Sequence, residues 1–396
     1  WSGAQVSVDN VNIKTGGSNS AGLRLNYAGT SLVANGGTIN TLGANAYGVD
    51  VAAGAKAEVN NVDITTAGGG AYAVRVSNVG SEAVINGGNL TASGVNSAGI
   101  MARAGGQVVA NDVNIIMLGG NGAAVWAGDA GSSVTYNGGS VTTSGVTRAF
   151  NIERGSHLDA SNVVVSTSAQ DSHGVVLSSN STGSVSNLDI TTSGLKAYGV
   201  AIQRNSELDV ANTKIVTGGQ TAYGLTAQTG SKLEATNILA TTTGEGSFGI
   251  RVLDADTQVD VSSGSFRTDG VGADGVNVTT GAVVNIAHED GALNTRITTT
   301  GAEAVALHAL NGGTINASGA DVRTLGNGSH AVVAAGGSTV NLTGGGFNPN
   351  GTGAHGVVAS GGSTVTMNSS IFQVFGADSH GVSLANDSIV IAERSF

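Results

Sequence analysis

The sequence contains no cysteine and a single proline in 396 residues, and only 11% of its residues are charged. Without cysteine there is no disulfide, no thiol nucleophile and no cysteine-ligated zinc. The net charge of −11 offers no basic stripe for phosphates, which excludes nucleic acid as a partner and disfavours adsorption to an anionic membrane. No apolar run approaches the length of a membrane span, so we expect no direct membrane insertion of this segment.

What the sequence has in abundance is a repeat. A short pattern, seen in Tyr47-Gly48-Val49-Asp50-Val51, recurs along the chain, mostly at intervals of 25 residues. Its copies are anchored at Gly22, Gly48, Ala73, Gly99, Ala124, Ala149, Gly174, Gly199, Gly224, Gly249, Gly275, Ala304, Ala331, Gly356 and Gly381. A period of this length, held over so many copies, is typical of a solenoid. The 64 glycines then serve recurring tight turns.

Each repeat contains three short strand patterns. In the copy that begins at Gly48, apolar and polar residues alternate over residues 49–51, 57–59 and 62–66, which is the period of a strand, and no stretch has the 3.6-residue period of a helix. We therefore predict an all-β fold, a parallel β-helix of about 15 coils with about 25 residues per coil. We expect residues 1–396 to form one such domain, cut from a longer protein because its first and last repeats are incomplete.

Two columns of equivalent residues support stacked coils. One is predicted to form a sharp turn, because Asn and Asp tolerate the left-handed backbone conformation; it contains Asn10, Asn35, Asn61, Asn86, Asp112, Asn137, Asn162, Asn187, Asn212 and Asn237. The other is predicted to face inward or to start the third turn, with stacked hydroxyls able to satisfy one another; it contains Thr143, Thr167, Thr192, Thr217, Thr242, Thr268, Thr299 and Thr324. The core between the turns is expected to be thin and built from Val, Ile, Leu and Ala.

Repeats such as residues 46–54 and 275–284 resemble coils of the pertactin-like passenger domains of Gram-negative autotransporters. The resemblance covers essentially the whole chain and implies a right-handed parallel β-helix, part of a longer passenger domain, displayed at the bacterial cell surface from the outer membrane or released. Many such passengers are adhesins or make cells aggregate. The chain has neither an Arg-Gly-Asp tripeptide nor pertactin's long proline-rich stretch, so integrin binding is not implied.

Binding residues are expected where the repeat is interrupted, because insertions in solenoids form loops. The largest insertion contains His288, Glu289 and Asp290, and the densest charge cluster contains Asp254, Asp256 and Asp260 with Arg251 and Arg267. Carboxylates on an outer face also occur in β-helical enzymes that process polysaccharides, where they must converge on one cleft. Asp254 and Asp256 are expected near a turn and Asp260 on a strand, which favours a solvated turn over such a cleft.

Two further patterns contain residue types that can carry chemistry. His330, His355 and His380 precede their anchors on three successive coils, and His173 holds the same position further up. Stacked imidazoles suit a metal site or a pH sensor, or the column simply prefers a ring, as Tyr and Phe do elsewhere. The segment Gly128-Asp129-Ala130-Gly131-Ser132 approaches a serine-protease signature, but Ala130 stands where the nucleophile belongs, which favours a turn.

Outward positions are mostly Thr, Ser, Asn and Ala, with scattered charges such as Arg251 and Arg323. Such a wall makes many modest hydrogen bonds that sum over a long contact. The sequence therefore predicts an adhesin without catalytic residues or cofactor, which self-associates between cells or attaches to a host protein or glycan. A polysaccharide-processing enzyme and an inert stalk are the alternatives.

Overall fold

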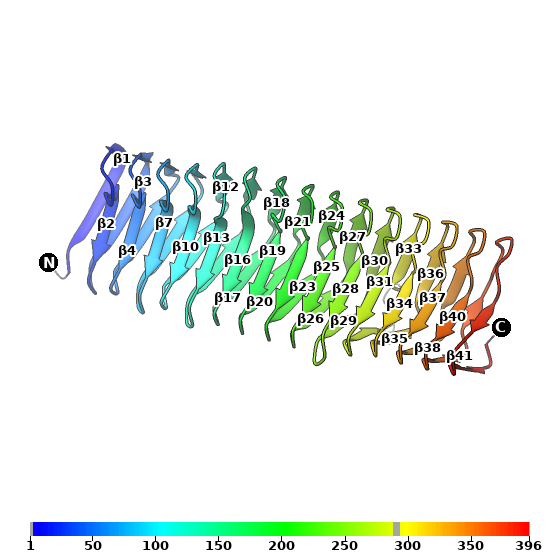
Figure 1. Ribbon diagram of the computed structural model, residues 1–396. Helices are drawn as coiled ribbons and strands as arrows, with labels where there is room; N and C mark the ends of the chain where they lie inside the picture. Colours follow the sequence, from blue (N-terminus) through cyan, green and yellow to red (C-terminus); the bar gives the residue numbers. More distant parts are fainter. Residues whose placement is uncertain (1–2, 288–293, 396) are drawn as a thin grey trace. The chain divides into compact units, whose positions relative to one another are not determined.

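The computed structural model describes residues 3–287 and 294–395. The fold is all-β, a parallel β-solenoid of about 15 coils with about 25 residues per turn, as predicted. The described residues contain no helix that could cross a membrane. The chain comprises two compact units, unit 1 (Trp1–Thr192) and unit 2 (Ser193–Phe396). Within each unit, the first, second and third strands of a coil pair in parallel with the same strands of the neighbouring coils (Figure 1).

Unit 1 contains the strands of the first coils. Its first strands are β2 (Leu23–Asn26), β4 (Val49–Ala52), β7 (Tyr72–Ser77), β10 (Ala98–Arg103), β13 (Ala123–Gly128), β16 (Arg148–Glu153) and β19 (Val175–Ser178). Second and third strands are continuous in β1 (Gln5–Thr15) and β3 (Ser31–Thr41). Further second strands are β5 (Lys56–Asn60), β8 (Glu82–Asn86), β11 (Gln107–Asn111), β14 (Ser133–Asn137), β17 (His157–Ser161) and β20 (Thr182–Ser186). Third strands are β6 (Asp63–Thr66), β9 (Asn89–Ala92), β12 (Asn114–Met117), β15 (Ser140–Thr143), β18 (Val164–Thr167) and β21 (Asp189–Thr192).

Unit 2 repeats the pattern. Its first strands are β22 (Val200–Gln203), β25 (Leu225–Gln228), β28 (Ile250–Leu253), β31 (Val276–Thr279), β34 (Leu307–Leu310), β37 (Val332–Ala335), β40 (Val357–Ser360) and β43 (Val382–Leu384). Second strands are β23 (Glu207–Ala211), β26 (Lys232–Thr236), β29 (Gln258–Val261), β32 (Val283–Ile286), β35 (Thr314–Ser318), β38 (Thr339–Thr343), β41 (Thr364–Asn368) and β44 (Ile389–Glu393). Third strands are β24 (Lys214–Thr217), β27 (Ile238–Thr242), β30 (Gly264–Thr268), β33 (Arg296–Thr299), β36 (Asp321–Thr324), β39 (Gly346–Pro349) and β42 (Ile371–Phe372).

The core of each coil follows the two-residue period of its strands. In β6, Ile64 and Thr66 are buried while Asp63 and Thr65 are exposed, because successive side chains of a strand point to opposite faces. The core is mostly Val, Ile, Leu and Ala, as expected, but Phe150, Phe266 and Phe347 are also fully buried. Because the inward side chains form the core, the outward side chains can differ from coil to coil without disturbing it.

The column of Asn and Asp residues predicted to form a turn mixes residues from two adjacent columns of the structure. Asn10, Asn61, Asp112, Asn162, Asn187, Asn212 and Asn237 do have positive φ. In three coils, however, the prediction was one residue early, since Asn35, Asn86 and Asn137 are not in this conformation and the residues that follow them, Gly36, Gly87 and Gly138, are. As far as Gly138 this turn alternates between Asn or Asp and Gly, because the side chain on one coil occupies the space next to the following coil's glycine; from Asn162 to Asn237 every coil has Asn.

Asn35, Asn86 and Asn137 instead belong to a ladder of stacked amides in unit 1. Each side-chain amide donates a hydrogen bond to the side-chain oxygen one coil earlier, at 2.7–3.3 Å, from Asn35 to Asp9, Asn60 to Asn35, Asn86 to Asn60, Asn111 to Asn86 and Asn137 to Asn111. The Ser161 hydroxyl donates to Asn137 at 3.0 Å and ends the run. We call this row, from Asp9 to Ser161, the amide ladder. It links one coil to the next through side chains as well as backbone.

The threonine column faces inward as predicted, but its hydroxyls do not satisfy one another. Thr217 Oγ1 donates to the carbonyl oxygen of Ala222 at 2.7 Å, and Thr299 Oγ1 donates to that of Ala304 at 3.0 Å. The same bond, five residues along the chain, is made by Thr167, Thr242, Thr268 and Thr324. These six threonines therefore close the turn that follows their own third strand, whereas the buried hydroxyl of Thr143 has no hydrogen-bond partner among the described residues.

Candidate functional site: a groove on the third-strand face

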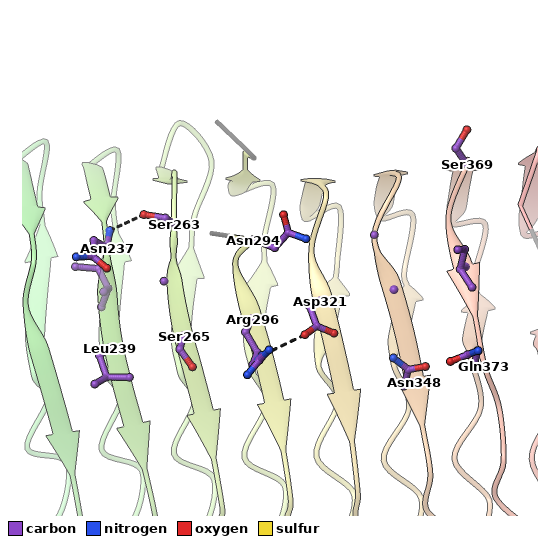
Figure 2. A pocket seen from close by; sticks show the side chains of 15 residues that line it. Asn237, Leu239, Ser263, Ser265, Asn294, Arg296, Asp321, Asn348, Ser369 and Gln373 are labelled. Carbon is purple, nitrogen blue, oxygen red and sulfur yellow. Dashed lines mark hydrogen bonds and ion pairs between the residues drawn. The ribbon is translucent and has the colours of Figure 1, made fainter. Parts of the chain in front are cut away.

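A groove of about 1250 Å³ runs across the third strands of unit 2, from β27 to β42. Figure 2 shows its outward side chains, with Leu239, Ser265, Arg296 and Asp321 on successive strands. A second hollow of about 690 Å³ shares Ser265, Arg296 and Asp321 with it and extends toward the next turn. The two hollows form one surface, which we call the third-strand groove.

The groove is hollow because small residues interrupt its columns. Along one outward column the strand registers place Leu239, Ser265, Arg296, Asp321, Gly346 and Ile371 side by side. Ser265 and Gly346 project little beyond the backbone. The longer side chains of Leu239, Arg296, Asp321 and Ile371 therefore form walls with space between them. Gly264 and Gly345 deepen the same floor near the turn.

Two of the three arginines that line the groove are paired with an aspartate. Arg296 Nε lies 3.1 Å from Asp321 Oδ2, and Arg267 Nη2 lies 2.8 Å from Asp269 Oδ1. Both arginine side chains are at least half exposed, so these pairs add little to stability. The third arginine, Arg323, has no ion pair among the described residues, so the groove keeps a small positive excess.

Other groove side chains have unused hydrogen-bonding groups. Arg323, Asn348 and Gln373 make no side-chain hydrogen bond or ion pair with any other residue that the structure describes. Apolar groups stand beside them, since Ile371 is 53% exposed and Phe375 72% exposed. The groove therefore offers donors, acceptors and apolar contacts to a ligand that lies along the stack.

The predicted charge cluster is divided among several places. Asp254 has positive φ in the turn after β28, and its Oδ2 accepts hydrogen bonds from the backbone N–H and the hydroxyl of Thr229, both at 3.2 Å. Asp256 also has positive φ in this turn. Asp260 lies on β29, where it accepts from Gln258 and Asn285. A solvated turn, which the sequence favours over an enzyme cleft, fits Asp254 and Asp256.

The two predicted arginines lie on different faces. Arg251, on β28, stacks over the ring of Tyr223 at 4.9 Å and donates to its hydroxyl at 2.7 Å. Arg267, on β30, lines the third-strand groove. Of the described candidates, Arg267 alone therefore lies in the groove. His288, Glu289 and Asp290 lie outside the described residues.

The histidine column stacks as rings, as Tyr47 and Tyr72 do. The ring centroids are 4.8 Å apart between His330 and His355 and 5.0 Å apart between His355 and His380. Nδ1 of His330 and of His355 each accepts the backbone N–H of the next histidine at 3.0 Å. Burial, with the neighbouring imidazoles, lowers the pKa of His330 and of His355. Within the described part of the chain no group of His, Cys, Asp and Glu could hold a metal ion.

The protease-like segment is a turn, as favoured from the sequence. Gly128 ends β13, Asp129 has positive φ, and the buried Ser132 donates its hydroxyl to the Gly128 carbonyl oxygen at 2.8 Å. Its hydroxyl also accepts the backbone N–H of Gly105 at 3.0 Å. Ser132 therefore stabilises two coils and faces no cleft.

Most of the groove was not predicted from the sequence. Asp321 and Gln373 lie in regular repeats, where no binding was expected, whereas Arg296 lies in the interrupted segment 282–300 and Asn348 in the interrupted segment 344–353, but neither was singled out. A signal was present, since Arg296 and Asp321 are 25 residues apart, which places opposite charges side by side on neighbouring coils. Aligning the repeats by outward column would have brought these residues together.

Comparison with known proteins gives one informative likeness. No protein-family model matches the chain, and no curated protein matches it. Among solved structures, the cryo-EM structure of the Vag8–C1 inhibitor complex matches with a TM-score of 0.55 and 17% identity, covering 98% of this chain and 100% of that one. The neighbour is Vag8, a Bordetella autotransporter passenger domain. At this identity the likeness is one of fold: the chain is a β-solenoid similar to that of an autotransporter passenger.

Proposed function

We propose that this chain is a bacterial surface adhesin, displayed from the outer membrane, that attaches by extended contact along the third-strand groove. The observation that carries the proposal is the third-strand groove, with hollows of about 1250 and 690 Å³ on consecutive coils, in which the side chains of Arg323, Asn348 and Gln373 have no hydrogen bond or ion pair among the described residues. Polar groups that are already solvated and lie in a row suit many weak contacts whose energies add.

The arrangement of charge favours a second copy of the chain as partner. Arg296 and Asp321 lie side by side on neighbouring strands. Arg267 and Asp269 form a second pair of opposite charges within one coil. When two such faces meet about a two-fold axis, the arginine of one opposes the aspartate of the other. Homotypic association between neighbouring cells is therefore the leading form of the proposal, and a host protein or glycan is the second.

The alternatives have less support. A polysaccharide-processing enzyme needs two carboxylates that converge on one cleft. Among the described lining residues of the groove Asp321 is the one carboxylate, and it is paired with Arg296. The fold likeness also supports a binding role, because Vag8 is seen in complex with a protein, C1 inhibitor.

A charge-exchange settling assay tests the proposal. One strain displays the chain on a neutral outer-membrane carrier with an acidic groove, Arg267→Glu, Arg323→Glu and Gln373→Glu. A second strain carries a basic groove, Asp269→Lys and Asp321→Lys. We expect wild-type cells to settle together, each variant strain to remain suspended alone because like charges repel, and a mixture of the two variants to settle again.

A matched control places new charge on another face. Ser318→Glu with Asn368→Glu adds acidic residues at exposed positions of the second strands and should leave settling unchanged. Settling of the acidic-groove strain like wild type would refute the groove as the contact surface. If wild-type cells neither settle nor bind in a screen of glycans and matrix proteins, the chain is a spacer and the proposal is wrong.

A further inference from the structure

A separate pocket of about 500 Å³ lies on the first-strand face of unit 1. It is remote in sequence from the third-strand groove and is formed by β7, β10, β13 and β16 together with the turns that precede three of them. Nothing in the proposed adhesive contact uses it.

The pocket is a gap in a column of rings. Tyr47 and Tyr72 stack with centroids 5.3 Å apart and planes 3° apart. The strand registers continue this column through Ala98 and Ala123 to Arg148. Two coils therefore carry a methyl group where their neighbours carry a large planar side chain. One face of the Tyr72 ring covers Tyr47, and the other is turned toward the coils that lack a ring.

Trp126 forms a second aromatic wall at an angle to the first. Its ring centroid lies 6.5 Å from that of Tyr72, with 60° between the planes. The indole N–H donates to Glu153 Oε1 at 3.2 Å, which holds the ring in place. Gly128 helps, because its missing side chain leaves room beside the indole nitrogen. Two aromatic surfaces at a fixed angle form a corner that is ready-made before any ligand arrives.

Planar polar groups surround this corner. Arg148 Nη1 donates to Asn151 Oδ1 at 2.8 Å, which orients both side chains at one end of the pocket. Glu153 and Asp171 add carboxylates, so the charged lining consists of one cation and two anions. That balance disfavours phosphate or sulfate and provides both donors and acceptors for a neutral ligand.

We propose that the corner formed by Tyr72 and Trp126 binds one neutral pyranose ring of a surface glycan. A pyranose has an apolar face of C–H groups, which packs on an aromatic ring, and a rim of hydroxyls, each able to donate and accept. Arg148, Asn151 and Glu153 present paired hydrogen-bonding groups to adjacent hydroxyls. The volume is of the size typical of small-molecule sites and holds a terminal sugar with part of the next.

The test uses the purified chain and methyl glycosides of the neutral hexoses and N-acetylhexosamines. Binding is followed by saturation-transfer NMR and by calorimetry. We expect at least one glycoside to bind to the wild-type chain, and Trp126→Ala to weaken its affinity by about tenfold or more. Ala123→Tyr, which inserts a ring into the gap, should block binding while the pocket's polar residues remain. Tyr72→Phe, which keeps the stacking surface, should retain it.

Controls separate this site from the adhesive groove and from loss of folding. Phe248→Ala removes a stacked ring from the first-strand face of unit 2, and Arg323→Glu alters the groove; neither should change glycoside affinity. Circular dichroism checks that each variant is folded. The proposal is overturned if no neutral glycoside binds, or if binding persists unchanged in both Trp126→Ala and Ala123→Tyr. It is also overturned if, in a parallel titration, the quaternary ammonium compound choline binds and no glycoside does. Because settling is measured separately, failure here leaves the adhesive function standing, and the reverse also holds.

Discussion

The amide ladder of unit 1 and the third-strand groove of unit 2 use similar amide side chains in different ways. In the amide ladder of unit 1, Asn60, Asn86 and Asn111 each donate to the coil before and accept from the coil after. In the third-strand groove of unit 2, Asn348 and Gln373 stand without side-chain hydrogen bonds to the rest of the described chain. Where amides bond one another they stabilise the stack, and where they stand apart they are available to a partner.

The largest expected effect is the loss of stability of unit 1 in acid, which unit 2 should not share to the same extent. Burial lowers the pKa of His173 in unit 1 from its ordinary 6.5 to about 4. The positive charge of Arg148 lowers it as well, and the negative charge of Asp171 partly opposes the shift. Because the folded form holds His173 neutral, its stabilisation is fully present above pH 6.5 and is lost as the pH falls to about 4, a change of about 3 kcal/mol. Urea unfolding between pH 7 and 4, followed by tryptophan fluorescence, measures this because Trp126 lies in unit 1.

The matched variants for this prediction are neutral at every pH. His173→Gln should remove most of the acid-dependent loss in unit 1, whereas His380→Gln in unit 2 should not affect it. An unchanged pH profile in His173→Gln would mean that another group governs the acid stability of unit 1.

Breaking the ladder should have the next largest effect. Asn86→Asp keeps the shape of the side chain but removes its donor, so that an acceptor faces Asn60 Oδ1, and we expect a loss of about 2 kcal/mol in unit 1. The same change in the groove, Asn348→Asp, should alter stability by less than about 0.5 kcal/mol. Equal effects at the two positions, by denaturant unfolding monitored by circular dichroism, would show that the ladder bonds add nothing.

A smaller effect is expected at the turn beside the ladder. Asn187 has φ of 56° and donates to Asn162 Oδ1 at 3.3 Å. Asn187→Val places a β-branched residue in the left-handed region and should cost about 1–2 kcal/mol, while Asn187→Gly should be nearly neutral. Thermal unfolding of the two variants side by side is the measurement, and similar melting temperatures would contradict the strain assigned to this position.

The sequence period predicted the coils well, because one apolar face per strand must meet the core in every repeat. It located the turn less well, since Asn and Gly both adopt positive φ and the pair Asn35-Gly36 does not say which of the two does so. It did not reveal the groove, which depends on what surrounds each side chain: Gly346 and Ser265 create space only because Arg296 and Asp321 stand between them. The sequence predicted that the histidines stack. It did not predict that each ring nitrogen accepts a backbone N–H, because this bond depends on how far one coil is offset from the next.

The amide ladder also has an electrical polarity. Every amide in it points its N–H toward the coil before, so the side-chain dipoles add in one direction, as peptide dipoles do along an α-helix. The positive end of this row meets Asp9, whose carboxylate accepts from Asn35 at 2.7 Å. An anion thus caps the row where an anion is favourable, and the hydroxyl of Ser161 ends it at the other side. Polarisation passed from one amide to the next would make each added coil bind its predecessor somewhat more strongly than an isolated pair could.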